Sequence, residues 1–532
     1  MTTVNGDLVI LSTGTSAQEF RLTGNTNFTL SLAGSLIISG GVLDLANGTG
    51  APTINIGGDF SQSGGTFKSS GSVSTVAFTG ANKTFTQSAG TFTTSNIDFT
   101  VATGASLTLA NDLPVATSRS LTVNGTLNTG TNAVTGAGAF TLASGATLGI
   151  GSAGGINSGT SQGNIRVSGT RTFNNGANYI FNGASDQVLG NGFSTTMNNL
   201  TIANAGITTN DRANLTVNGN LVVNAGSTFD LSTYSVTSVG GTVTNNGTLK
   251  QTKTVAASGT TSFLTIPTAK YYGVDITAGT TALGSTTVAV SGNQVCSQAS
   301  GYPVKRCFEI TPASQQSANI KFYFTNAQMQ TDQTLSSLNV WHYNGSTWDS
   351  ITKGTTGGTS SCGNGAIDCF VEGTGITSYS PFALKNTSPQ AVTLADFSAA
   401  QSGDAVLLTW ETNSELENRG FNLYRGTDPA APDRQLNDAL IPSQSQGNPG
   451  GFIYTWEDRA DLTPGTTYYY WVEDVDIYGA ATRHGPVSVD YGAPTAVRLV
   501  DAGAVTALPW AMPLAAVGLL ALAALAAVGR RR

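Results

Sequence analysis

The sequence predicts an all-β protein in which a parallel β-helix is followed by two β-sandwich domains and a C-terminal transmembrane helix. Three observations lead to this fold class. Short alternating strands separated by Gly and Asn recur through the first half of the chain. Two further segments have longer strands with clustered aromatic residues. The chain ends in an uncharged Ala/Leu/Val run that is followed by arginines.

Composition limits both the fold and the function. The chain has 532 residues, which is too long for one hydrophobic core, so several domains are expected. Charged residues make up only 10%, the net charge is -7, and Gly occurs 65 times. The polar character comes from Thr, Ser, Asn and Gly, which suit short strands and tight turns. An acidic chain with few basic residues lacks the positive footprint for nucleic acid, so we exclude nucleic acid as a partner.

Residues 1–285 are predicted to form a solenoid. A unit of Gly, a small residue and a strand starts at Gly104, Gly125 and Gly145, and this spacing of about 20 residues suits one coil. A single coil cannot bury its apolar face, so successive coils would stack Leu, Val, Ile and Phe into one core. Gly and Asn suit the corners because both tolerate left-handed backbone conformations. A parallel β-helix is the favoured architecture, and an array of β-sandwiches is the alternative.

Two stretches of this segment carry a resemblance to known proteins. They are residues 179–187, Tyr-Ile-Phe-Asn-Gly-Ala-Ser-Asp-Gln, and residues 199–202, Asn-Leu-Thr-Ile. Through them the segment resembles the β-strand repeats of bacterial surface proteins and haemagglutinin-like adhesins. The resemblance implies an architecture more than an activity.

Residues 286–390 are predicted to form an antiparallel β-sandwich, because alternating strands surround Trp341 and Trp348. The segment holds the cysteines of the chain in two local pairs: Cys296 with Cys307, and Cys362 with Cys369. Two disulfides are the favoured interpretation in an exported chain, although four cysteines allow three connectivities. A zinc site is the alternative, but neither pair has the short gap that is typical of metal knuckles.

Residues 391–492 are predicted to form a second β-sandwich. Trp410 lies in an early predicted strand, and residues 462–468, Leu-Thr-Pro-Gly-Thr-Thr-Tyr, lead into a late strand with a tyrosine corner. On these cues the segment resembles a fibronectin type III domain. It departs from a typical module in an extended loop between Asp428 and Gly451. The fold by itself implies no chemistry.

A linker, residues 493–505, leads to residues 506–532, which are predicted to cross a membrane as a helix. About 20 apolar residues span the hydrocarbon core, and terminal arginines favour the cytoplasmic side, so the rest of the chain would be exported. The apolar run is flanked by these residues: Leu508, Pro509 and Trp510 before it, and Arg530, Arg531 and Arg532 after it. This layout resembles the C-terminal sorting signals of exported bacterial proteins, such as the PEP-CTERM class.

The tail differs from two known classes of sorting signal. It lacks the Thr-Gly of the sortase signal and the Pro-Glu-Pro of the PEP-CTERM class. A permanent membrane anchor is the alternative to a processed tail. Residues 1–6 open directly into strand-like sequence without a signal peptide, so we expect the natural chain to begin further upstream.

Candidate catalytic groups are few. His342 and His484 fall in different predicted domains, and neither is accompanied by a nucleophile-elbow sequence. His342 is predicted to lie at the surface or edge of a strand. Glycoside hydrolysis uses paired carboxylates, but the aspartates of the solenoid do not recur in pairs at coil spacing. We interpret the following as solvated turn residues: Asp44, Asp59, Asp98, Asp112, Asp186, Asp211 and Asp230.

A calcium site is considered at two acidic stretches, residues 457–458 and residues 473–476. Calcium favours several hard oxygen ligands, but the spacing does not match an EF-hand loop. Alternating acids on a sandwich strand are better interpreted as its solvent face. No catalytic, cofactor-binding or metal-binding residue is therefore predicted.

The sequence predicts an exported, surface-anchored bacterial protein that has a structural or adhesive role and no enzymatic activity. Its expected partners are the membrane, through the C-terminal helix, and polysaccharides or proteins at the cell surface or outside the cell. One alternative is a β-helix protein that binds or cleaves polysaccharide. Another is a binding module that acts through the fibronectin-like domain, with the solenoid as a spacer.

Overall fold

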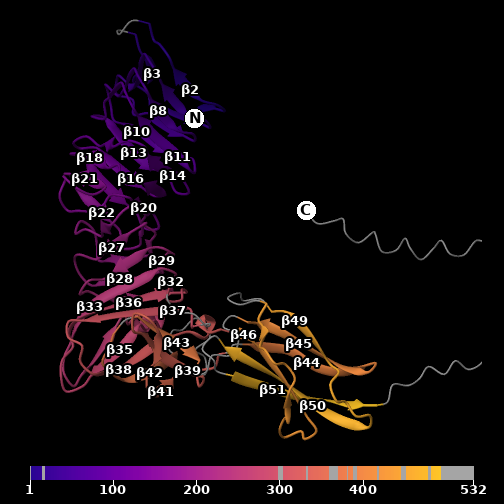
Figure 1. The fold of residues 1–532 in the computed structure, drawn as a ribbon. Helices are drawn as coiled ribbons and strands as arrows, with labels where there is room; N and C mark the ends of the chain where they lie inside the picture. Colours follow the sequence, from indigo (N-terminus) through magenta and orange to yellow (C-terminus); the bar gives the residue numbers. More distant parts are fainter. Residues whose placement is uncertain are drawn as a thin grey trace, which may run out of the picture.

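The computed structural model describes residues 2–14, 18–297, 303–330, 333–358, 369–379, 381–386, 392–415, 418–444, 451–476 and 481–492. These residues form a rod of stacked β-coils that leads into a β-domain, with a separate β-sandwich beside the base of the rod (Figure 1). The helices of the described residues are two short 3-10 turns, η1 (Pro267–Ala269) and η2 (Asn326–Gln328).

Each coil of the rod contributes strands to three faces. The first face is sheet A, continued by sheet F; the second is sheet B; the third is sheet C, continued by sheet D and by the first strands of sheet E. Neighbouring strands within a face come from successive coils and pair in parallel. Among the described residues, sheet B contains 11 strands, one from each coil. The prediction of a parallel β-helix is confirmed.

The strands of the first face are, in sheet A, β1 (Thr2–Val4), β4 (Thr29–Leu32), β7 (Thr53–Ile56), β10 (Ser74–Phe78), β13 (Ile97–Val101), β16 (Ser120–Val123), β19 (Ala139–Leu142) and β22 (Arg171–Phe173), and in sheet F, β25 (Thr196–Met197), β28 (Leu215–Val217) and β31 (Val236–Val239). Sheet B consists of β2 (Leu8–Ile10), β5 (Leu36–Ile38), β8 (Phe60–Gln62), β11 (Lys83–Gln87), β14 (Ser106–Leu109), β17 (Thr126–Asn128), β20 (Thr147–Ile150), β23 (Asn178–Phe181), β26 (Leu200–Ile202), β29 (Leu221–Val223) and β32 (Val243–Asn245). The third face begins with sheet C, of β3 (Phe20–Thr23), β6 (Val42–Ala46), β9 (Thr66–Lys68) and β12 (Thr91–Phe92), and sheet D, of β15 (Leu113–Pro114), β18 (Val134–Gly136) and β21 (Ile165–Val167).

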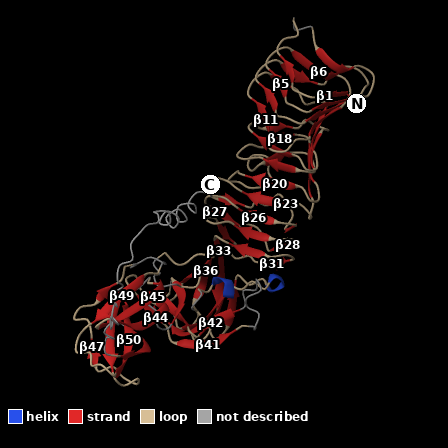
Figure 2. Cartoon of the chain, turned by 90° about the vertical axis from the view of Figure 1, so that its right-hand side faces the viewer, coloured by secondary structure: helices blue, strands red, loops and turns tan. Residues whose placement is uncertain are grey.

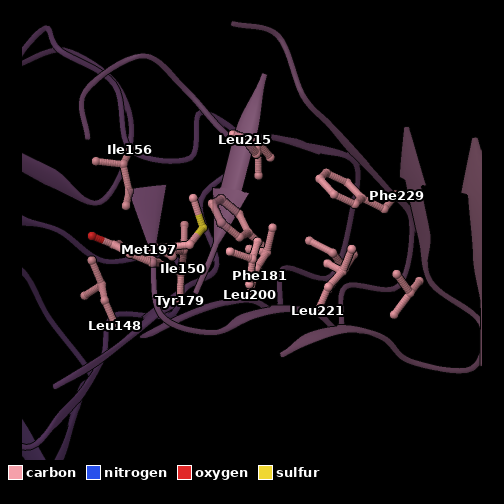
Figure 3. Packing of buried hydrophobic residues seen from close by; sticks show 14 of the residues in the cluster. Leu148, Ile150, Ile156, Tyr179, Phe181, Met197, Leu200, Leu215, Leu221 and Phe229 are labelled. Carbon is pink, nitrogen blue, oxygen red and sulfur yellow. The ribbon is translucent and has the colours of Figure 1, made fainter. Parts of the chain in front are cut away.

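The core of the rod follows from the alternation within each short strand. Strands such as β26 and β29 bury their first and last residues and turn the middle residue outward. Because the strands pair in register, Leu200 lies beside Leu221 and each coil covers the apolar side chains of the next. Figure 3 shows these side chains converging between the walls of the solenoid. Stacking of coils therefore buries what one coil could not bury alone.

The corners of the coils require glycine for two different reasons. Gly104 has a φ of +79°, a left-handed conformation that favours glycine. At Gly125, a Cβ atom would lie 2.3 Å from the carbonyl oxygens of Ala102 and Ala105, so a side chain would collide with the neighbouring coil. The predicted period is not uniform. Contacts between adjacent coils span 28 residues at Asp7 but 21 residues further along the rod.

The rod ends where the third face changes from parallel to antiparallel pairing. Sheet E runs through β24 (Gln187–Val188), β27 (Ile207–Thr209), β30 (Thr228–Asp230), β33 (Thr248–Val255), β36 (Gly284–Gly292), β37 (Arg306–Pro312), β43 (Phe382–Asn386), β39 (Leu338–Tyr343) and β40 (Trp348–Ser350). Strand β33 pairs in parallel with β30 but antiparallel with β36. Figure 2 shows β33 and β36 at the base of the rod. Sheet E therefore belongs both to the rod and to the domain that follows it.

A second antiparallel sheet completes that domain. Sheet G consists of β34 (Thr260–Phe263), β35 (Val274–Ala278), β38 (Ala318–Phe324), β42 (Cys369–Ile376) and β41 (Lys353–Gly357). One hydrophobic cluster extends from Ile10 in the first coil to Leu384 in β43. Residue 285, where sequence places a domain boundary, lies inside β36.

The last described segment is a sandwich with its own core. One sheet contains β44 (Thr393–Ser402), β45 (Ala405–Ser414) and β49 (Ile453–Asp458), and the other contains β47 (Arg434–Gln435), β46 (Asn418–Gly426), β50 (Thr466–Asp476) and β51 (Ala481–Tyr491), with β48 (Ile441–Pro442) beside β46. Trp410 is buried and stacks on Tyr454, with ring centroids 5.0 Å apart. The Tyr468 hydroxyl accepts a hydrogen bond from the Thr463 N–H at 2.9 Å. Such a contact is expected of a tyrosine corner, and membership of the fibronectin type III family stays a prediction.

The predicted fold class is wrong in its final element. No helix in the described part of the chain is long and apolar enough to cross a membrane. The two 3-10 turns have three residues each, whereas a span needs about 20 residues. The predicted linker, residues 493–505, and the predicted membrane segment, residues 506–532, lie outside the described residues.

Candidate functional site

The aspartates of the solenoid hold successive coils together. Asp59 Oδ1 accepts the Thr84 N–H at 2.8 Å, across 25 residues of sequence. Five more make the same kind of bond to a backbone N–H one coil away: Asp44 to Ser70, Asp98 to Ser120, Asp112 to Ala133, Asp186 to Ile207 and Asp211 to Gly190. Asp230 instead bonds the nearby Ser232 N–H and pairs with Lys250. These carboxylates satisfy N–H groups at the corners, where the ladder hydrogen bonds stop.

A polar hollow of about 370 Å³ lies on the outer face of sheet E, where the rod meets the domain. Its lining residues are Thr228, Thr248, Lys250, Thr287, Ala289, Ser291, Glu309 and Thr311. We call it the sheet E hollow. The residues come from β30, β33, β36 and β37, so both parallel and antiparallel strands contribute to it.

The strand register explains why this face is hollowed. Lys250 of β33 lies opposite Ala289 of β36, and Ala289 lies opposite Glu309 of β37. Strands are about 4.8 Å apart, so the two charged residues stand about 10 Å apart with a methyl group between them. Ala289 is therefore the floor of the hollow, and Lys250 and Glu309 are its walls. Lys250 also pairs with Asp230 at 2.8 Å, so part of its charge is already compensated.

Hydroxyl groups line the two sides of this floor. Thr248 Oγ1 and Ser291 Oγ are 2.9 Å apart on one side. On the other side Thr287 lines the hollow, and its Oγ1 lies 2.8 Å from Oγ1 of Thr252, which is outside the lining. Each hydroxyl can donate and accept, so a bonded pair still has acceptor capacity for a ligand. Together with one ammonium and one carboxylate, the hollow can bind a ligand that carries several hydroxyl groups.

A smaller pocket of about 140 Å³ lies where sheet B ends. Its lining residues are Val243, Thr244, Asn245, Tyr271, Gly292, Asn293, Thr325 and Gln328. We call it the junction pocket. The Asn245 Nδ2 group donates to the Val290 carbonyl oxygen at 2.9 Å and to the Tyr271 hydroxyl at 3.2 Å. Asn245 Oδ1 is buried and has no hydrogen-bond partner within the described residues.

A buried arginine supports the wall of the junction pocket. Arg306 is 1% exposed, and its guanidinium lies 5.0 Å from the ring centroid of Tyr271 and 5.6 Å from that of Phe308. Its Nη2 group donates to the Tyr272 carbonyl oxygen at 2.9 Å. Burial lowers the pKa of Arg306, because a guanidinium is costly to desolvate. Stacking on two rings fixes Tyr271 from the side of the core.

The acidic groups of the C-terminal sandwich are bound to donors rather than gathered around an ion site. Asp458 pairs with Arg425 at 2.6 Å, and both side chains are buried. Asp474 pairs with His484 at 2.5 Å. Within the described ranges there is no group of three His, Cys, Asp or Glu residues that could hold a metal ion.

The prediction for His342 is wrong. The side chain is 4% exposed and packs against Phe382, with ring centroids 5.1 Å apart. It is buried because β39 pairs with β43 inside sheet E and is not an edge strand. A strand assignment from sequence does not show which neighbours cover each face.

The predicted disulfide between Cys296 and Cys307 is present. Cys369 is also disulfide-bonded, while Cys362 lies outside the described residues. The predicted sorting residues also lie outside them: Leu508, Pro509, Trp510, Arg530, Arg531 and Arg532. Sequence did not identify either pocket. The alternation in residues 248–252 and 287–291 is a signal from which the outward side chains could have been predicted, but it does not show that Ala289 lies between Lys250 and Glu309.

Comparison with known proteins adds little to this geometry. No protein-family model matches the chain, and no curated protein matches it. Among solved structures, a β-1,2-glucanase from Parabacteroides distasonis aligns at 10% identity with a TM-score of 0.13. The alignment covers 46% of this chain and 37% of that chain. A TM-score of this size supports no argument about fold or activity.

Proposed function

We propose that the chain is an exported structural or adhesive protein. Its β-helix acts as a stiff spacer between the domains at its base and the far end of the rod. The observation that carries this proposal is the single core that extends from Ile10 to Leu384. A core without a break resists bending, because a bend would separate packed side chains in every coil. The strands of sheet B stack at about 4.8 Å, which makes the rod about 50 Å long.

The use of the carboxylates supports a non-catalytic role. A glycosidase keeps two carboxyl groups facing one substrate, at a separation that suits a nucleophile or a water molecule. In the solenoid, aspartates such as Asp59 and Asp112 are instead bound to backbone N–H groups of the adjacent coil. We infer that the protein presents surfaces for contact and does not cleave its partner.

Export is the proposed location, and the Cys296–Cys307 disulfide supports it, because such bonds persist in oxidising compartments. Cell fractionation followed by mass spectrometry of the peptide that contains this pair tests the proposal. We expect the oxidised peptide outside the cytoplasm. Recovery of the reduced peptide in the cytoplasmic fraction would overturn export.

A second candidate function is polysaccharide binding in the sheet E hollow, which the hydroxyl-lined floor favours. The full chain would be sedimented with insoluble polysaccharides while release of reducing ends is measured. We expect Ala289→Leu, which fills the floor, to abolish co-sedimentation. Ala139→Leu is the matched control, because Ala139 is a half-buried, outward residue on sheet A. Equal binding by both variants would reject the hollow, and release of reducing ends would reject the non-catalytic role.

A further inference from the structure

We propose that the junction pocket binds a neutral ligand that bears hydroxyl groups and has the size of one sugar ring. The pocket exists because the two sheets of the rod end at different places. Sheet B stops at β32, whereas sheet E continues from β33 into β36 and β37. The free edge of β32 therefore faces a space that another coil would have filled. Thr244 and Asn245 line that space from β32, and Gly292 lines it from the end of β36.

The polar groups that remain available match a hydroxyl group. Asn245 is 6% exposed, and its Oδ1 atom can still accept a hydrogen bond. The neighbouring Tyr271 hydroxyl accepts from Asn245, which leaves its proton for an acceptor. A ligand hydroxyl would donate to the first atom and accept from the second after a small movement of the Asn245 side chain, because Oδ1 is buried in the empty pocket. A buried acceptor without a partner is costly, so binding such a group recovers part of that cost.

The residues that line the junction pocket disfavour a charged ligand. None of its side chains is ionised at neutral pH: Val243, Thr244, Asn245, Tyr271, Gly292, Asn293, Thr325 and Gln328. Gln328 and Asn293 are already bonded to each other and to nearby groups, which holds the wall in place. A charged ligand would lose hydration without a direct ion pair, because Arg306 is buried against the Tyr271 ring and is not part of the lining. The sheet E hollow differs, because Lys250 and Glu309 flank it.

The volume limits the ligand to a single ring or a short polyol. An extended peptide added to the free edge of β32 would need several residues, each rising about 3.3 Å along the strand. A space of about 140 Å³ does not hold such a segment. Ordered water is the competing occupant, because polar cavities commonly contain it.

Saturation-transfer difference NMR with the full chain tests the proposal, with glucose as the neutral probe and glucuronate as its charged counterpart. We expect saturable glucose binding with a Kd of about 1 mM and at least about tenfold weaker binding of glucuronate. No saturable glucose signal up to about 50 mM would mean that the pocket holds water alone, which would overturn the proposal.

Single substitutions test whether the glucose signal comes from the junction pocket. Val243 is half-buried, lines the pocket and lies on the same face of β32 as Asn245, so Val243→Phe reduces the space without removing the Asn245 hydrogen bonds. We expect it to weaken glucose binding by at least about tenfold. Val243→Leu is the smaller variant if the phenylalanine variant does not fold. Ala139→Leu, on the outer face of sheet A, is the control that should leave glucose binding unchanged. Binding that survives both Val243 variants, or that is lost only when Ala289→Leu fills the sheet E hollow, would overturn the assignment.

Discussion

Replacement of Asp44 by alanine tests how much one inter-coil contact contributes to the rod. Asp44 Oδ1 accepts the Ser70 N–H at 2.9 Å, and Oδ2 accepts the Ser70 hydroxyl. The Asp44 side chain is fully buried, and Lys68 Nζ lies 3.9 Å from Oδ2. Asp44→Ala removes both hydrogen bonds and leaves the neighbouring ammonium with one carboxylate fewer.

The magnitude follows from the exposure of the two partners. A hydrogen bond to a charged group contributes about 1.5–3 kcal/mol. Ser70 is exposed, so its freed N–H can bond to water, and loss of a buried carboxylate also relieves a desolvation cost. The lower part of the range is therefore appropriate, and we expect local destabilisation of about 2 kcal/mol. At about 1.4 kcal/mol per factor of ten, amide exchange near Ser70 should become about 30-fold faster.

Hydrogen-exchange mass spectrometry measures this change coil by coil. Because each coil contacts only its neighbours, the effect should be confined to peptides around residues 42–75, while residues 215–245 keep their protection. Asp44→Asn is the matched control, since its Oδ1 still accepts the Ser70 N–H and should retain most of the protection. Uniform acceleration along the whole rod, or no acceleration near Ser70, would refute the reasoning.

Three further changes test other contacts. Cys296→Ser opens a crosslink between residues 11 positions apart and should lower the free energy of unfolding of the domain at the base by about 2–3 kcal/mol in denaturant titrations; no change under oxidising conditions would contradict this. Arg425→Ala leaves the buried Asp458 unpaired and should cost about 3–5 kcal/mol in the C-terminal sandwich by thermal unfolding, whereas the double change Arg425→Met with Asp458→Asn, which removes both charges, should cost clearly less. A hydrogen bond from Lys68 holds the pKa of Glu19 below its usual value. The ionised Glu19 carboxylate therefore stabilises the fold above the pKa that it has in the unfolded chain, and this stabilisation is lost as the pH falls through the pKa of the folded state. Amide protection factors in the first coils, corrected for the intrinsic pH dependence of exchange, should therefore fall on acidification more in the native chain than in Glu19→Gln.

The solenoid could be predicted from sequence because its signals are local. Gly104, Gly125 and Gly145 mark corners, and alternation within each strand separates inward from outward residues. The interpretation of the aspartates as solvated turn residues holds for Asp59, Asp112, Asp186 and Asp211, which are exposed, and is wrong for Asp44, which is buried. Sequence did not reveal their bonds to the adjacent coil, because these bonds join residues that are far apart along the chain. Asp112 and Ala133 are 21 positions apart, and only the stacking of coils brings them together.

The end of the rod could not be predicted, because it depends on strand order rather than on strand pattern. β33 and β36 alternate in the same way, and nothing local shows that they pair antiparallel after a parallel series. The segment around β39 likewise reads as a strand, but its position between β43 and β40 decides that His342 is buried. The membrane helix was inferred from apolar length alone, and no helix within the described part of the chain has the required length.

Both candidate ligand sites arise from this one change in pairing. In a regular coil, each sheet receives one strand, and the outer face repeats without interruption. At the end of the rod, β36 returns antiparallel and places Ala289 between Lys250 and Glu309, which creates the sheet E hollow. The same return leaves β32 without a following strand, which creates the junction pocket beside Asn245. The coils would thus supply length and stiffness, while the irregular junction supplies the concave polar surfaces on which recognition would depend.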